Sequence, residues 1–378
     1  MFRQRLVLVA MSALAVLGMA SVTSPVHAAT DAAVNAGRGD NGPVIVAHRG
    51  ASGYRPEHTL ASYELAARMG ADFIEPDLVI TSDGVLVARH EPEIGGTTDV
   101  STRPEFADRK TTKLLDGVEV TGWFAEDFTL AELKTLRAKE RIPQLRPSNT
   151  IYDGRFEVPT LQEVIDLAKR LSKELGRQIG IYPETKHPTY FREQGLPLEP
   201  ELVRTLTRNG LNRPNAKVYI QSFEVGNLKA LSKQVRVPLV QLVDGSGKPY
   251  DFTVSGDPRT YSDLLTPKGL REIASYAKGL GPQKDRIIPR DANGYLTQPT
   301  TLVADAHRVG LTVHPWTFRA ENNFLPADFR SSADPAQWGD IFAEYEAFLA
   351  TGIDGLFADH PDIAIEAVKA YTAERATA

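Results

Sequence analysis

The chain has 378 residues, of which 43 are Lys or Arg, 48 are Asp or Glu and none is Cys, and its formal net charge is −5. With 42% hydrophobic and 24% charged residues it has the composition of a globular protein, which excludes collagen, coiled coil and extensive disorder. The lack of Cys excludes disulfides, thiolate zinc sites, iron–sulfur clusters and thiol nucleophiles, so any metal must be bound by carboxylate or imidazole groups.

The first 28 residues have the pattern of a secretory signal peptide. Arg3 and Arg5 precede an apolar run at 6–19. Val26 and Ala28 then provide the small residues of a cleavage site. A membrane anchor is the alternative, but the run of about 14 residues is shorter than the roughly 20 needed to span a bilayer. We therefore expect an exported protein, periplasmic or secreted.

Cleavage after residue 28 would change the charge balance of the mature chain. It removes two Arg and no acidic residue, leaving 41 basic and 48 acidic side chains and a net charge of −7. Such a chain offers no basic surface for nucleic acid or for an anionic membrane. We expect a small-molecule substrate, no nucleic-acid partner and no stable membrane association.

Residues 29–42 are polar and Gly-rich, which indicates a flexible leader, and 43–378 has no repeat or low-complexity break and is interpreted as one domain. Helical patterns alternate with predicted strands, and two of them begin with a capping box, at Thr129-Leu-Ala-Glu132 and Thr160-Leu-Gln-Glu163. Strands that alternate with helices favour a parallel sheet, and eight such units predict a (β/α)₈ TIM barrel. The eight predicted strands are rich in β-branched residues and lie at Val44–Ala47, Phe73–Ile80, Ile179–Tyr182, Val218–Ile220, Leu239–Val243, Arg286–Ile288, Leu311–Val313 and Gly355–Phe357.

An insertion is predicted after the second barrel strand. Asp83-Gly84 is typical of a turn, and 85–89 is predicted to be a further short strand that ends at His90. From Glu91 to about Phe128 the chain is polar and irregular. We interpret 91–128 as an inserted region on the face that bears His90, where it would shape access for the substrate; the alternative is a disordered surface loop.

Polar residues stand where several predicted strands end, which in a TIM barrel is the edge that carries the active site. The residues at these strand ends are His48 and Arg49, Glu75 and Asp77, His90, Glu184 and Lys186, Gln221, His314 and Trp316, and Asp359.

Glu75 and Asp77 are two residues apart on a strand, so both side chains point to the same face. If that face is the barrel interior, burial opposes the charge of two crowded carboxylates and a bound cation relieves it. Glu184 could supply a third oxygen ligand. Oxygen ligands without Cys suit Ca²⁺ or Mg²⁺. On a solvated strand, the same pair would be an ordinary polar face.

His48 and His90 are candidates for a general base and a general acid, because imidazole titrates near neutral pH. A hydrogen-bonded structural role is the alternative for each. Arg49 and Lys186 suit an anionic substrate such as a phosphate, and would otherwise be salt-bridge partners of the acids. Together these residues indicate metal-assisted phosphoryl transfer, while other metal-dependent barrel chemistry fits the same composition.

Four short motifs occur in order along the N-terminal part of the chain: His48-Arg49-Gly50, Pro56-Glu57-His58-Thr59, Glu75-Pro76-Asp77 and His90. With them, the sequence resembles the glycerophosphodiester phosphodiesterase family over nearly the whole mature chain. Five later segments are similar to the periplasmic, calcium-using branch of that family: Phe128–Lys134, Ile179–Lys186, Gln221–Phe223, Val313–Thr317 and Gly355–Pro361.

The resemblance implies a role for each matching residue. Glu75, Asp77 and Glu184 would bind one divalent cation, Ca²⁺ rather than Mg²⁺, His48 and His90 would be the acid–base pair, Arg49 and Lys186 would hold the phosphodiester, Trp316 would pack against the glycerol moiety, and Glu57 would support these groups from behind. Trp316 is equally typical of core packing.

The implied reaction is hydrolysis of a glycerophosphodiester to glycerol 3-phosphate and an alcohol. One His removes the proton of the neighbouring glycerol hydroxyl, which attacks phosphorus, and the other protonates the departing alcohol; water then opens the cyclic phosphate. Two residues depart from the family pattern: Glu91 replaces an Asp after the second His, and His58 replaces an Asn. Both are expected to change hydrogen bonds around the site.

Three other functions fit parts of the pattern. A phospholipase D or sphingomyelinase D type of lipid phosphodiesterase shares the two His and the Glu-x-Asp, but would need an apolar rim that the sequence does not indicate. A glycoside hydrolase would need its two carboxylates across the substrate, not adjacent on one strand. A secreted binding protein without activity would lack a catalytic group. His187, His307 and His360 are interpreted as surface or structural residues.

Overall fold

Parallel strands form a closed ring in the part of the chain that the computed structural model describes, residues 42–377. The predicted signal peptide and the leader up to residue 41 lie outside these residues. The ring contains, in order, β1 (Val44–His48), β2 and β3 (Phe73–Glu75 and Asp77–Ile80), β7 and β8 (Gly180–Ile181 and Glu184–Thr185), β9 (Ile220–Ser222), β10 (Leu239–Val243), β11 (Gly279–Pro282), β12 (Thr312–Val313) and β13 (Gly355–Ala358).

The ring closes because its first and last strands are neighbours. β13 pairs in parallel with β1, with Val46 opposite Phe357. On its other side β13 meets the chain after β12, where the Phe318 N–H donates to the Phe357 carbonyl at 2.8 Å. The predicted (β/α)₈ barrel is therefore confirmed.

Two barrel strands are interrupted by proline. Pro76 separates β2 from β3, and Tyr182-Pro183 separates β7 from β8. Proline has no N–H to donate to a neighbouring strand, so the ladder breaks at each position while the chain direction continues. The run predicted as one strand, Phe73–Ile80, is thus two segments of one barrel strand.

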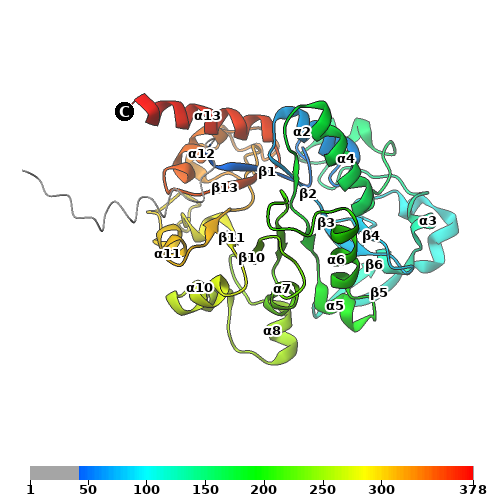
Figure 1. Ribbon diagram of the computed structural model, residues 1–378. Helices are drawn as coiled ribbons and strands as arrows, with labels where there is room; N and C mark the ends of the chain where they lie inside the picture. Colours follow the sequence, from blue (N-terminus) through cyan, green and yellow to red (C-terminus); the bar gives the residue numbers. More distant parts are fainter. Residues whose placement is uncertain (1–41, 378) are drawn as a thin grey trace, which may run out of the picture. The chain divides into compact units, whose positions relative to one another are not determined.

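Helices follow the strands around the outside of the barrel (Figure 1). Helix α4 (Leu161–Glu174) begins with the predicted capping box, in which the Glu163 N–H donates to Thr160 Oγ1 at 3.1 Å and the Thr160 N–H donates to Glu163 Oε2 at 2.7 Å. The apolar residues of this helix are buried on one face, and that face packs against the barrel. The outer helices are α2 (Leu60–Met69), α4 (Leu161–Glu174), α5 (Pro188–Glu193), α6 (Leu198–Arg208), α7 (Val225–Leu231), α8 (Tyr250–Ser255), α9 (Tyr261–Leu264), α10 (Pro267–Ala274), α11 (Leu302–Arg308), α12 (Ile341–Leu349) and α13 (Pro361–Thr377).

The sixth strand differs from the prediction. The run Arg286–Ile288 is not a strand, since Lys284–Arg286 forms a 3₁₀ turn. The strand is β11, Gly279-Leu-Gly-Pro282, whose glycines lie where the methyls of Val240 and Leu242 leave no room for a Cβ. A strand with two glycines and a proline has almost no β propensity, and packing against β10 decides its conformation.

The predicted insertion is ordered and longer than 91–128. After β4 (Leu86–Ala88), which runs antiparallel to β3, the chain does not reach a barrel helix until Leu161. Phe106, Phe124 and Phe128 are buried, and Phe106 and Phe128 belong to the main hydrophobic core, which explains why the insertion is not a disordered loop. It contains the hairpin β5 (Thr111–Leu115) and β6 (Val118–Gly122), helix α3 (Leu130–Leu133) and short 3₁₀ turns.

An apolar layer closes the lower part of the barrel interior. Four of its side chains come from strands and the fifth, Tyr182, from the break between β7 and β8. The five are Val46, Phe73, Tyr182, Val240 and Phe357. Side chains alternate along a strand, so the next inward position on each of these strands lies one layer nearer the C-terminal edge.

Within residues 42–377, none of the helices has the length and apolar character to cross a membrane.

Candidate active site at the C-terminal edge of the barrel

The layer above the apolar residues is polar. Two residues after Val46, Phe73, Tyr182 and Phe357 come His48, Glu75, Glu184 and Asp359, all buried. The alternation of the strands thus carries side chains that are far apart in the sequence to one level of the barrel.

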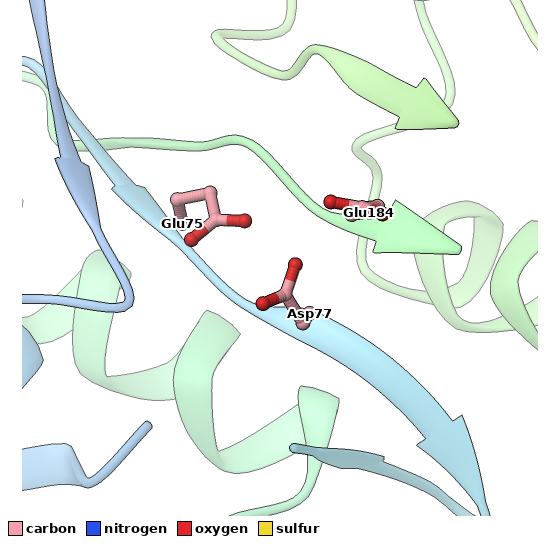
Figure 2. A group of neighbouring side chains, drawn as sticks. All are labelled: Glu75, Asp77 and Glu184. Atoms are coloured by element: carbon pink, nitrogen blue, oxygen red, sulfur yellow. The ribbon is translucent and has the colours of Figure 1, made fainter. Parts of the chain in front are cut away.

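Three carboxylates converge in this layer (Figure 2). Glu75 and Asp77 come from the two halves of the second barrel strand and Glu184 from its neighbour β8, where Asp77 and Glu184 are paired residues. One oxygen of each lies within 4.8 Å of the others, and their exposed fractions are 1%, 1% and 6%. The buried oxygen Asp77 Oδ1 has no hydrogen-bond partner among the described residues. These residues therefore fit a hard divalent cation.

Neighbouring groups fix the orientation of two of these carboxylates. The Arg49 backbone N–H donates to Glu75 Oε2 at 2.7 Å, and Gln221 Nε2 donates to Glu75 Oε1 at 3.1 Å. His58 Nε2 donates to Asp77 Oδ2 at 2.9 Å, and the fully buried His58 ring is held in turn by the Tyr63 hydroxyl.

Burial and the neighbouring charges raise the pKa of two of these carboxyls and lower that of the third. Burial, and then the charge of Asp77, raise the pKa of Glu75 well above its usual range. Burial raises the pKa of Glu184 to about 8. Burial would also raise the pKa of Asp77, but Lys186 and His58 hold it well below its usual range. Without a cation, ionisation of Glu75 and Glu184 is thus disfavoured, and a bound cation would favour the ionised form of all three carboxyls.

His48 lines the same cavity as the carboxylates and is held by Asp359. Its Nδ1 lies 2.6 Å from Asp359 Oδ1, which leaves Nε2 for the cavity that the ring lines. The second oxygen, Asp359 Oδ2, accepts from Arg146 at 2.6 Å and from Arg319 at 2.9 Å. Burial and the nearby Arg49 lower the pKa of His48 to about 4, against the opposite effect of Asp359, so the ring is neutral.

His90 also lines this cavity and follows strand β4. Its Nδ1 lies 2.7 Å from Glu91 Oε1, and its Nε2 lies 3.3 Å from Lys186 Nζ. Burial, followed by the charges of Arg49 and Lys186, lowers the pKa of His90 to about 3. Each imidazole therefore has a carboxylate on Nδ1, and both rings line one cavity.

Two buried cations complete the site. The Arg49 guanidinium is held by both oxygens of Glu57, at 3.0 and 3.1 Å, and Glu57 also accepts from Arg141 at 2.8 Å. Lys186 Nζ lies 3.0 Å from Glu184 Oε1. Both cations are 5–6% exposed and line the same cavity as the imidazoles, so an anion that enters meets them directly.

The cavity has a volume of about 410 Å³, and its apolar wall contains Phe223, Trp316 and Phe357. The Trp316 indole N–H donates to the Gly281 carbonyl at 2.8 Å, which fixes the ring beside Phe223 at a centroid distance of 5.6 Å. A second hollow of about 790 Å³ adjoins it beyond Lys186 and is lined by residues of α8, α9 and the insertion.

The chain matches the profile of the glycerophosphoryl diester phosphodiesterase family over residues 48–363. It belongs to this family. The match covers most of the chain and includes every strand of the barrel except the start of β1. Members of the family are phosphoric diester hydrolases, and the chain is such an enzyme.

Individual relatives agree with this assignment. The chain is 38% identical over 335 residues to a glycerophosphodiester phosphodiesterase of Arabidopsis thaliana, covering 84% of this chain and 83% of the relative. It is 29% identical over 352 residues to a glycerophosphodiester phosphodiesterase of Haemophilus influenzae, covering 86% and 90%. A phosphodiesterase of Oleispira antarctica, solved in complex with sn-glycerol-3-phosphate, is similar in fold, with a TM-score of 0.54 at 19% identity over 87% of this chain and 97% of that one.

The structure brings together the residues to which the resemblance assigns a role. His48, Arg49, Glu75, Asp77, His90, Glu184, Lys186 and Trp316 line one cavity, and Glu57 lies behind Arg49. His314 stays below the site, where its ring bonds the Tyr182 hydroxyl at 2.9 Å.

Sequence reasoning missed the residues that hold the site from outside. Arg146 and Arg319 lie in loops and carry no spacing signal, although both bind Asp359. His187 was interpreted as a surface or structural residue, but its ring lies one side chain away from His90, on Glu91. The departures from the family pattern at His58 and Glu91 were the available signals, since each of these side chains contacts a predicted site residue.

Proposed function

We propose that the chain is an exported, divalent-metal-dependent glycerophosphodiester phosphodiesterase that releases glycerol 3-phosphate and an alcohol. One observation carries the proposal: a buried cluster of three carboxylates lines one cavity together with the imidazoles of His48 and His90 and the cations of Arg49 and Lys186. That combination suits an anionic diester and transfer of a proton on either side of phosphorus. The relative solved with sn-glycerol-3-phosphate supports the choice of product.

Glu75, Asp77 and Glu184 would hold the cation, which when bound supplies positive charge to the phosphoryl oxygens. We propose Ca²⁺ rather than Mg²⁺, because Mg²⁺ is usually bound through one or two carboxylates and several waters, whereas Ca²⁺ accepts a larger set of oxygen ligands. The similarity to the calcium-using branch along Ile179–Lys186 supports the same choice.

The protein residues then divide the work of hydrolysis. Arg49 and Lys186 bind the phosphoryl oxygens and offset the charge that builds up on them. One imidazole accepts the proton of the glycerol hydroxyl next to the ester through Nε2, and that hydroxyl attacks phosphorus. The other imidazole gives a proton to the departing alcohol. Water opens the resulting cyclic phosphate with the two roles reversed.

The apolar wall and the second hollow would each bind one end of the substrate. Trp316, fixed by its indole N–H, would pack against the glycerol carbons. The departing alcohol would lie in the adjoining hollow, which shares Glu184, Lys186 and Phe223 with the catalytic cavity. A periplasmic or secreted location follows from the predicted signal peptide at 1–28.

Release of glycerol 3-phosphate from glycerophosphocholine tests the function. The full mature chain should release it in Ca²⁺, should stop in chelator, and should recover when Ca²⁺ is restored more fully than when Mg²⁺ is restored. Absence of product with any divalent ion would refute the function, whereas release that resists chelator would refute only the metal site. N-terminal sequencing of exported protein that began at Met1 would refute the signal peptide.

A further inference from the structure

We propose that Asp116, at the tip of the β5–β6 hairpin, and His187, which precedes helix α5, position the catalytic imidazole of His90 through Glu91. The insertion would thus be part of the catalytic apparatus and not only a rim around it. This proposal rests on the function proposed above, because it assigns work to His90.

The four side chains form an unbroken line of contacts. His90 Nδ1 lies 2.7 Å from Glu91 Oε1. The other oxygen, Glu91 Oε2, lies 3.1 Å from His187 Nε2. The second nitrogen of that ring, His187 Nδ1, lies 2.7 Å from Asp116 Oδ2. A ring bonded to carboxylates through both nitrogens donates through both, so His187 is placed as a cation between Glu91 and Asp116.

The charges around His187 favour this state. Burial would lower the pKa of His187, but the hydrogen bonds to Asp116 and Glu91 raise it to about 9. With Glu91 Oε2 occupied by the His187 cation, Glu91 Oε1 remains to accept from His90 Nδ1. That bond fixes the His90 tautomer and ring orientation, and leaves Nε2 toward the substrate.

The same arrangement recurs at His48, which makes the contacts at His90 more than a chance surface cluster. Asp359 Oδ1 faces His48 Nδ1 at 2.6 Å, while Asp359 Oδ2 accepts from Arg146 at 2.6 Å. Each catalytic imidazole therefore bonds a carboxylate whose outer oxygen is held by a cation. At His48 that cation is an arginine, and at His90 it is a histidine that Asp116 keeps charged.

The hairpin is built to hold Asp116 in place. Asp116 and Gly117 form its two-residue turn, and Asp116 adopts a left-handed backbone conformation with φ of 50°. Leu115, next to the turn, is buried. Lys113 Nζ contacts Glu126 at 2.9 Å and Asp127 at 2.7 Å, which ties the hairpin to the rest of the insertion.

The isosteric variant Asp116→Asn tests the proposal, with Glu119→Gln on the exposed side of the same hairpin as the matched control. In the Ca²⁺-loaded enzyme, Asp116→Asn should lower kcat about tenfold with little change in KM or in the midpoint of thermal unfolding. Glu119→Gln should leave all three unchanged. A kcat for Asp116→Asn within twofold of the wild type would overturn the proposal, as would equal losses in the two variants.

The imidazole signals provide a readout that does not depend on turnover. In the ¹⁵N-histidine-labelled full chain, with the His90 signal assigned from His90→Gln, the ring should be a single tautomer protonated at Nδ1. In Asp116→Asn it should become a mixture of tautomers, and an unchanged His90 spectrum would overturn the proposal. If the wild type released no glycerol 3-phosphate, the proposed function would fail, while these spectra would still decide the role of Asp116.

Discussion

At the scale of single residues, His48 and His90 are alike in what holds them and different in where they come from. His48 is the last residue of the first barrel strand, and His90 lies two residues after the short antiparallel strand β4, outside the ring. Both rings have Nδ1 on a carboxylate and a lowered pKa, so both are neutral at physiological pH. If the two rings act as the proposed acid–base pair, one of them must gain a proton, which a negatively charged substrate bound beside it would favour.

Loss of either imidazole should abolish the chemical step and leave the fold intact. We expect His48→Ala and His90→Ala each to lower kcat about 10²–10⁴-fold, measured as glycerol 3-phosphate release, with unchanged far-UV circular dichroism. His307→Ala is the control, because His307, on helix α11, bonds Asp354 at 2.7 Å and lines no part of the cavity. The His307→Ala variant should keep the activity of the wild type. Near-normal turnover in either of the first two variants would exclude that residue as acid or base.

The sequence predicted the groups that line the cavity better than the groups that hold them. Glu75 and Asp77 could be predicted from their spacing of two on a strand, and His48 from its position at the end of the first strand. The partners of Asp359 could not, because Arg146 lies 213 positions away and reaches the site from a loop of the insertion. Such contacts depend on how loops of different origin pack, and no local pattern reports that.

At the scale of helices and strands, features that depend on a few neighbouring residues were predicted correctly from the sequence. The capping boxes at Thr129 and Thr160 are both present, since each requires only four consecutive residues. The sixth strand was predicted at the wrong place because its conformation depends on distant residues. Gly279-Leu-Gly-Pro282 is a strand only because β10 and β12 lie on either side of it. Tertiary packing overrides propensity in such segments.

The start of helix α4 offers a test of stability that should not touch catalysis. Thr160→Ala removes the hydroxyl that accepts the Glu163 N–H, and we expect it to lower the free energy of unfolding by about 1 kcal/mol. Urea denaturation measures this, with kcat unchanged. Thr160→Ser keeps the hydroxyl and should recover most of the loss. Equal stability of the Ala and Ser variants would show that the capping box does not stabilise the helix.

At the scale of the whole molecule, the barrel is divided into an apolar layer and a charged layer that act on each other. The layer of Phe73, Tyr182 and Phe357 excludes water from below, so the carboxylates above it lie in a medium of low polarity. Their repulsion is correspondingly strong without a cation. The site that suits metal binding is therefore also a source of instability in the metal-free protein.

This conflict predicts that the stabilising effect of Ca²⁺ grows with pH. In the metal-free fold the pKa of Glu184 is raised from 4.5 to about 8, so its unfavourable ionisation is absent below pH 4.5 and complete above about pH 8. The free energy of unfolding of the metal-free protein should fall across that window, and Ca²⁺ should restore it. We expect a larger increase in the midpoint of thermal unfolding on adding Ca²⁺ at pH 8 than at pH 5. Glu75→Gln, which removes one of the three carboxylates proposed to bind the cation, should reduce the effect of Ca²⁺. Equal Ca²⁺ shifts at both pH values, or a Glu75→Gln protein that responds like the wild type, would contradict a shared carboxylate site.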